Sequence, residues 1–195
     1  MTSSLARFIS FIFNPILLLV FVPFFMLYKI EGDWNAALWW TGYSIIFLFV
    51  LTLFLSLAVK KGIFTNMDVS KREQRPLLFL VCAILGIIYI IGLFQLNGPV
   101  ILKEIMVGIM IGIVLVSFIN TRLKASIHVA TISALLFSLA VVYNGYYLLL
   151  LVLIPLVAWS RLKIKRHTLP ETVVGGLLGI LLSLMIYVLG RVLFS

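Results

Sequence analysis

Long apolar stretches separated by short polar segments dominate this chain. A helix crosses the roughly 30 Å hydrocarbon core of a bilayer with about 20 residues, and most of the stretches approach that length. Their spacing predicts an all-α, polytopic membrane protein with six to seven transmembrane helices in one bundle. The expected spans are Phe8–Tyr28, Leu38–Val59, Leu77–Leu96, Val100–Ile119, Ser126–Tyr143, Tyr146–Trp159 and Thr172–Leu193.

Local signals within these stretches refine the expected helices. Asn14-Pro15 interrupts the first span, and because proline bends or breaks a helix we expect a kink there. The sixth span is short for a crossing, and we expect it to continue helically into Ser160 and Arg161. Gly175 and Gly179 lie four residues apart in the last span, a spacing that lets two helices pack closely.

The composition agrees with lipid as the solvent of this protein. Hydrophobic residues make up 64% of the chain, whereas soluble domains contain about 45–50%. We find no internal repeat and no stretch polar enough for a soluble domain, so residues 1–195 are expected to form a single integral membrane domain. The chain has a net charge of +9, and its positive residues lie between the apolar runs. This placement favours contact with lipid headgroups over nucleic acid.

The positive charges are unevenly shared between the two membrane faces that these spans define. Of the 15 Lys and Arg, all but Lys29, Lys103 and Arg191 fall on the side of the N-terminus. Cytoplasmic loops carry the excess of positive residues in most membrane proteins. The pattern therefore predicts a multi-pass protein of the cell membrane, with its N-terminus in the cytoplasm and its C-terminus outside.

Three polar segments on that face hold the residues best suited to chemistry: Lys71–Pro76, Lys124–His128 and Ser160–Glu171. Two crossings separate each from the next, so all three can meet at one face. The last two contain the only histidines of the chain, and His167 lies four residues before Glu171. A carboxylate orients a neighbouring imidazole, and Arg and Lys neutralise the oxygens of a phosphoryl group. The combination favours attack on a phosphate.

The third segment resembles the third motif of the type-2 phosphatidate phosphatase superfamily, the membrane lipid phosphatases related to vanadium haloperoxidases. That motif is Ser-Arg, five residues, His, three residues, Asp. Here Ser160-Arg161, five residues, His167, three residues and Glu171 match it, with Glu in place of Asp. The resemblance covers the chain from about Lys71 to Gly179 and is most specific in this segment.

The other two motifs of that superfamily match in part. The second is Pro-Ser-Gly-His, of which Ala125-Ser126-Ile127-His128 keeps the serine and the histidine. The first is Lys, six residues, Arg-Pro. Arg75-Pro76 matches its end, but Asp68 stands where the lysine is expected, so Lys71 or Arg72 would supply that charge.

The resemblance implies a metal-independent lipid phosphate phosphatase that uses no cofactor. His167 would attack phosphorus, Glu171 would orient it, and His128 would protonate the leaving oxygen. The substrate would be a phospholipid or polyprenyl phosphate, hydrolysed through a phosphohistidine. The residues expected to bind its phosphate are Arg161, Arg75, Arg72, Lys71, Ser126 and Ser160. Many bacterial members work on the outer face of the inner membrane, whereas the charge pattern here favours the cytoplasmic face, so both faces stay open.

Other interpretations of the same residues remain open. The departures Ala125 and Ile127 and the missing lysine would also suit a catalytically degenerate member that binds or transports anionic lipids. Basic segments between spans are ordinary, Arg75-Pro76 would also start a helix, and His128 would also serve in helix packing. A magnesium-dependent prenyltransferase is excluded, because it needs paired acidic motifs and the chain's only aspartates are Asp33 and Asp68.

Overall fold

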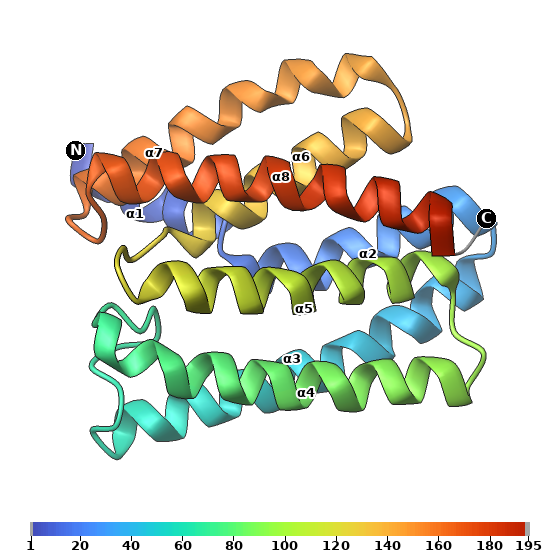
Figure 1. Cartoon of the computed structure of the whole chain (residues 1–195), viewed down its shortest axis with the longest axis horizontal. Helices are drawn as coiled ribbons and strands as arrows, with labels where there is room; N and C mark the ends of the chain where they lie inside the picture. Colours follow the sequence, from blue (N-terminus) through green and yellow to red (C-terminus); the bar gives the residue numbers. More distant parts are fainter. Residues whose placement is uncertain (1, 194–195) are drawn as a thin grey trace. The chain divides into compact units, whose positions relative to one another are not determined.

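The computed structural model describes residues 2–193, and every regular element in that range is a helix (Figure 1). Two of them are 3-10 helices, η1 (Arg72–Gln74) and η2 (Gly145–Val152). The α-helices are α1 (Thr2–Ile12), α2 (Pro15–Glu31), α3 (Trp34–Lys60), α4 (Arg75–Gln95), α5 (Val100–Asn120), α6 (Ile127–Val142), α7 (Leu153–Lys163) and α8 (Leu169–Leu193). The all-α fold class expected from the sequence is confirmed for these residues.

Two compact units divide the described residues. Unit 1 consists of residues 2–17 and 121–193, and unit 2 of residues 18–120. Unit 1 therefore combines α1 with α6, η2, α7 and α8, whereas unit 2 contains most of α2 together with α3, η1, α4 and α5. The expectation that the two units form a single domain stays a prediction.

Within residues 2–193, five helical stretches are long and apolar enough to cross a membrane, and α1 with α2 adds a sixth if that bent pair forms one span. The five are α3, η1 with α4, α5, η2 with α7, and the part of α8 up to Val188. Their outer faces are apolar, as in Phe49 and Phe118, which are 66% and 76% exposed. These features are compatible with a multi-pass membrane protein.

The seventh helix of the expected bundle is not confirmed. The fifth predicted span corresponds to α6, which has only 16 residues. A helix of that length covers about 24 Å, less than the roughly 30 Å of a bilayer core. Extended backbone limits it at both ends, at Ser126 before the helix and at Asn144 after it. The apolar run in the sequence is therefore longer than the helix that it forms.

The break predicted in the first span is confirmed. α1 ends at Ile12, α2 begins at Pro15, and the two helices are bent relative to each other. Between them, the Asn14 side chain accepts a hydrogen bond from the backbone of Ile16 at 2.9 Å, which caps the start of α2. The helical continuation of the sixth span is also confirmed, since α7 includes both Ser160 and Arg161.

The two glycines of α8 allow α6 to pack closely against it in unit 1. A Cβ atom added at Gly175 would lie 2.6 Å from the carbonyl oxygen of Ser126, and one added at Gly179 would collide with the carbonyl oxygen of Ala130. Small residues at this spacing bring helix backbones together. The close packing predicted from the sequence is confirmed, and it joins the N-terminal ends of α6 and α8, where the candidate site lies.

Unit 2 has a separate core. Its central members are Leu27, Trp40, Tyr89 and Leu93, which come from α2, α3 and α4. The hydroxyl groups of Ser44 and Tyr89 lie 2.8 Å apart within it, so α3 and α4 are joined by a hydrogen bond as well as by apolar contact. Buried polar groups are usually paired in this way, and the pair fixes the register of the two helices.

Candidate active site

The second and third polar segments of the sequence meet in unit 1. The backbone N–H of Ser126, directly before α6, donates to the carbonyl oxygen of Glu171, in the first turn of α8, at 3.0 Å. Gly175 makes this approach possible because it has no side chain, whereas a Cβ atom at this position would clash with the Ser126 backbone. Two residues expected at one site from separate spans are therefore neighbours.

His167 lies in the short connection between α7, which ends at Lys163, and α8, which begins at Leu169. The end of α7 is a Schellman turn, in which the Arg166 N–H donates to the carbonyl oxygen of Arg161 and the Lys165 N–H to that of Leu162, both at 3.0 Å. Lys165 has the left-handed backbone such a turn needs, with φ of 58°. This local turn accounts for the five residues that separate Arg161 from His167.

The start of α8 has one of the two hydrogen bonds of a capping box, and Glu171 makes it. One oxygen of its carboxylate, Oε2, accepts a hydrogen bond from the backbone N–H of Thr168 at 3.1 Å. The Thr168 carbonyl in turn accepts the first helical bond, from Thr172. The pattern Thr-x-x-Glu before an apolar run is a sequence signal for such a cap, and our sequence interpretation missed it.

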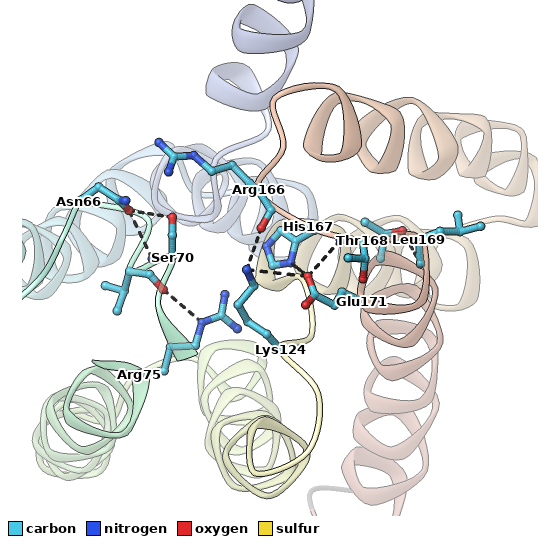
Figure 2. A network of polar contacts seen from close by, with 11 residues as sticks. Asn66, Ser70, Arg75, Lys124, Arg166, His167, Thr168, Leu169 and Glu171 are labelled. Carbon is cyan, nitrogen blue, oxygen red and sulfur yellow. Dashed lines mark hydrogen bonds and ion pairs between the residues drawn. The ribbon is translucent and has the colours of Figure 1, made fainter. Parts of the chain in front are cut away.

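The same oxygen of Glu171 contacts the imidazole of His167. Nδ1 of His167 and Oε2 of Glu171 lie 2.9 Å apart, and the side chains are only 3% and 14% exposed (Figure 2). When the carboxylate is ionised it can only accept, so Nδ1 then donates the proton of this contact. The contact expected from the four-residue spacing is present, and it orients the imidazole ring.

Lys124 also reaches this group, although our sequence interpretation gave it no specific role. Its ammonium group donates to the carbonyl oxygen of Arg166 at 2.9 Å and lies 3.9 Å from Oε2 of Glu171 (Figure 2). The Lys124 side chain is 19% exposed. In the sequence it is one border cation among many, and no local pattern distinguishes it from Arg122 two residues earlier.

Ser126 and His128 lie at the N-terminal end of α6. Ser126 is fully buried, and among residues 2–193 its hydroxyl oxygen has no hydrogen-bond partner. A buried hydroxyl without a protein partner is uncommon and needs an explanation, such as a bound anion or water. His128 is 7% exposed and lies in the first turn of α6, two residues beyond Ser126.

The Ser-Arg pair of the third motif lies in the last two turns of α7, and the structure shows contacts of both side chains with protein. Nη1 of Arg161, which is 2% exposed, donates to the Ser10 hydroxyl of α1 at 2.6 Å. The Ser160 hydroxyl donates to the carbonyl oxygen of Val157 at 2.7 Å, within its own helix. The hydroxyl proton of Ser160 is therefore used by the helix, whereas Arg161 joins α7 to α1.

The first motif lies in unit 2, where a compact loop holds Arg75. Its side chain is buried, and Nε donates to the carbonyl oxygen of Val69 at 3.2 Å. Val69 has a left-handed φ of 44°, and the Asn66 side chain steadies the turn by accepting from the backbone and hydroxyl groups of Ser70 (Figure 2). Arg75 is thus held by a local structure of its own.

The other two cations of that segment are not buried. Lys71 and Arg72 are exposed, and the Arg72 guanidinium lies 4.0 Å from the neighbouring Glu73 carboxylate. They belong to unit 2, so the meeting of the first segment with the other two stays a prediction.

Comparisons of this chain with protein-family models, curated proteins and solved structures find no match. The resemblance to lipid phosphatases therefore rests on the residues quoted above. Among residues 2–193, no group of three His, Cys, Asp or Glu side chains is arranged to hold a metal ion.

Proposed function

We propose that this protein is an integral membrane phosphatase that hydrolyses a lipid phosphate or an isoprenoid diphosphate. The observation that carries the proposal is the buried His167–Glu171 pair. Next to Glu171 lies Ser126, which directly precedes α6 and has a buried hydroxyl group. An oriented imidazole suits nucleophilic attack on phosphorus, and the backbone bond from Ser126 to Glu171 brings a buried hydroxyl donor to the same part of unit 1. The motif spacing described above supports the same class of reaction.

The proposed reaction has two steps. In the first, Nε2 of His167 forms a bond to phosphorus, the bond from phosphorus to the lipid oxygen breaks, and His128 donates a proton to that oxygen. The Glu171 carboxylate stabilises the positive charge that develops on the His167 ring. In the second step water attacks phosphorus, the P–N bond breaks, and His128 takes the proton from water. The products are the lipid alcohol, or the lipid monophosphate from a diphosphate, and inorganic phosphate.

Fixed donors would stabilise the charge on the transferring phosphoryl group. Ser126 offers a buried hydroxyl next to the Glu171 backbone. Arg161 remains a candidate, because its fixed positive charge lies in unit 1 together with His167 and Ser126. Arg75, with Arg72 or Lys71, would complete the set if the loop of unit 2 faces the same substrate.

A second candidate function is binding or transport of an anionic lipid without hydrolysis. It is favoured by the contacts of Ser160 and Arg161, which were expected to donate hydrogen bonds to the substrate phosphate. Both side chains instead donate to protein atoms, Ser160 to the Val157 carbonyl and Arg161 to the Ser10 hydroxyl. This function needs positive charge at the membrane face but no nucleophile. It predicts lipid binding that is unchanged when His167 is replaced.

Phosphate release and phosphoenzyme trapping separate the two functions. The purified full-length protein is assayed with phosphatidate, phosphatidylglycerophosphate and undecaprenyl diphosphate in mixed micelles without added metal. We expect release from at least one substrate, an acid-labile and base-stable phosphoryl group on the protein, and loss of both in His167→Ala. Lys163→Met, which removes an exposed cation at the end of α7, is the matched control and should behave as wild type. Equal background release by wild type and His167→Ala from every substrate would reject the phosphatase.

A further inference from the structure

Lys124 connects the two caps that enclose His167. Its ammonium group donates to the carbonyl oxygen of Arg166, the last residue of the Schellman turn that ends α7. The same ammonium lies 3.9 Å from Oε2 of Glu171, the acceptor of the capping box that starts α8. His167 is the one residue between these caps, so a single side chain from another segment spans the turn that presents it.

Three positively polarised groups converge on one carboxylate oxygen. Nδ1 of His167 lies 2.9 Å from Oε2 of Glu171, and the Thr168 N–H donates to the same oxygen at 3.1 Å. The Lys124 ammonium lies 3.9 Å from it. An ionised carboxylate accepts from Nδ1 rather than donating to it, and the lone pair of the ring is then on Nε2. The Lys124 ammonium is placed to hold in position the carboxylate oxygen that Nδ1 contacts.

The burial of the group strengthens this interaction. The His167 and Glu171 side chains are 3% and 14% exposed, so the contact between them is shielded from water, and Lys124 is itself mostly covered. An exposed ion pair at 3.9 Å contributes little, whereas a partly buried one in a hydrogen-bonded network contributes more. The contacts of Lys124 with the Arg166 carbonyl and with Glu171 are with the elements that position His167.

We propose that Lys124 is a positioning residue of this site, which holds the His167 turn and keeps the Glu171 carboxylate as the acceptor of Nδ1. The proposal rests on the proposed function for its consequence in catalysis. It assigns Lys124 to the orientation of the nucleophile and not to the binding of substrate phosphate.

Steady-state kinetics test this assignment through the split between kcat and KM. Lys124→Met keeps the length of the side chain and removes its charge and donors. We expect kcat to fall roughly ten- to a hundredfold, as for other residues that orient a reacting group, with KM within about threefold of wild type. Lys124→Arg should restore most of kcat, and Lys163→Met should match wild type in both constants. A rise in KM at unchanged kcat would overturn the assignment, because it would mean that Lys124 binds the phosphate.

Nuclear magnetic resonance of the histidine rings gives a readout that does not depend on activity. The chain has only two histidines, so ¹⁵N-histidine labelling gives two ring systems, and His128→Gln assigns the one that belongs to His167. We expect a downfield Nδ1 proton for His167 in the wild type and in Lys124→Arg, and its loss or shift in Lys124→Met.

The two measurements keep the proposals separable. If no substrate releases phosphate, the proposed function fails, and the ring spectrum still decides the role of Lys124. If Lys124→Met leaves the His167 ring signals unchanged while the protein remains folded by circular dichroism, the positioning role is rejected, whatever the activity.

Discussion

The two polar regions of the chain are held in different ways. In unit 2, Nε of Arg75 donates to the carbonyl of Val69 in the preceding loop, which a five-residue Asn66–Ser70 turn steadies. In unit 1, the groups around His167 come from elements far apart in the sequence, and Arg161 is bonded to a serine 151 residues away. The comparison teaches that the arginine loop is held largely by bonds between near neighbours, with one from Asn120 of α5 to the Arg72 carbonyl, whereas the histidine site needs α1, α6, α7 and α8 to pack together.

Glu171 carries the largest expected effect, because it serves both as a helix cap and as the partner of His167. Glu171→Gln keeps the reach of the capping box but removes the charge, and we expect kcat to fall by about 10² to 10⁴ with little loss of stability. Glu171→Asp keeps the charge but is one methylene shorter, so it should weaken the cap and lower the free energy of unfolding by about 1 kcal/mol. Phosphate release measures the activity of both variants, and thermal unfolding in detergent measures their stability. Equal effects of both variants on activity and stability would contradict a double role.

The Ser10–Arg161 contact tests how far unit 1 depends on its N-terminal helix. Ser10→Ala removes the hydroxyl that accepts from a buried guanidinium, and we expect the free energy of unfolding to fall by about 1.5–3 kcal/mol. Ser4→Ala makes the same change on the exposed side of α1 and should have almost no effect. Chemical unfolding in mixed micelles compares the two. A matching loss in both variants would mean that helix propensity, and not the contact with Arg161, is responsible.

Adjacent glycines of α8 test the packing that brings Ser126 to Glu171. Gly175→Ala places a Cβ atom 2.6 Å from the Ser126 carbonyl and should cost about 1–3 kcal/mol, together with part of the activity. At Gly176 the nearest atoms would lie at 3.7 Å, an ordinary contact, so Gly176→Ala should be tolerated. Unfolding and phosphate release are measured for both. Tolerance of Gly175→Ala would mean that α6 and α8 are not in close contact at this level.

The loop of unit 2 should have the smallest effect on activity and only a modest effect on stability. Asn66→Ala removes both hydrogen bonds to Ser70, whereas Ser70→Ala removes only the hydroxyl bond. We expect losses of about 1–2 kcal/mol for the first and about half of that for the second. A several-fold fall in phosphate release by Asn66→Ala would support the predicted meeting of this loop with the histidine site. Unchanged release in a protein with a disturbed loop would speak against a role for Arg75.

Much of the helical structure follows from local sequence signals. The lengths of the apolar runs predict α3, α4, α5 and α8 within a few residues, and Pro15 predicts the break after α1. The four-residue spacing predicts the contact of His167 with Glu171, but on a shared helix face, whereas the structure places His167 two residues before the start of α8. The cap at the start of α8 could have been predicted as well, from the Thr-x-x-Glu pattern of Thr168 and Glu171. Each of these properties depends on the backbone geometry of neighbouring residues.

Tertiary structure alone decided which distant groups became partners. No pattern in the sequence indicates that Lys124 reaches the Arg166 carbonyl, that Arg161 bonds to Ser10, or that Asn120 bonds to the carbonyl of Arg72. Even the length of α6 depended on context, because an apolar composition favours a span without saying where the helix must stop. Hydrophobicity and periodicity specify which segments are helices, but a long, flexible Lys or Arg side chain can satisfy its donors in many ways. Packing selects one of them, and in unit 1 that selection creates the site.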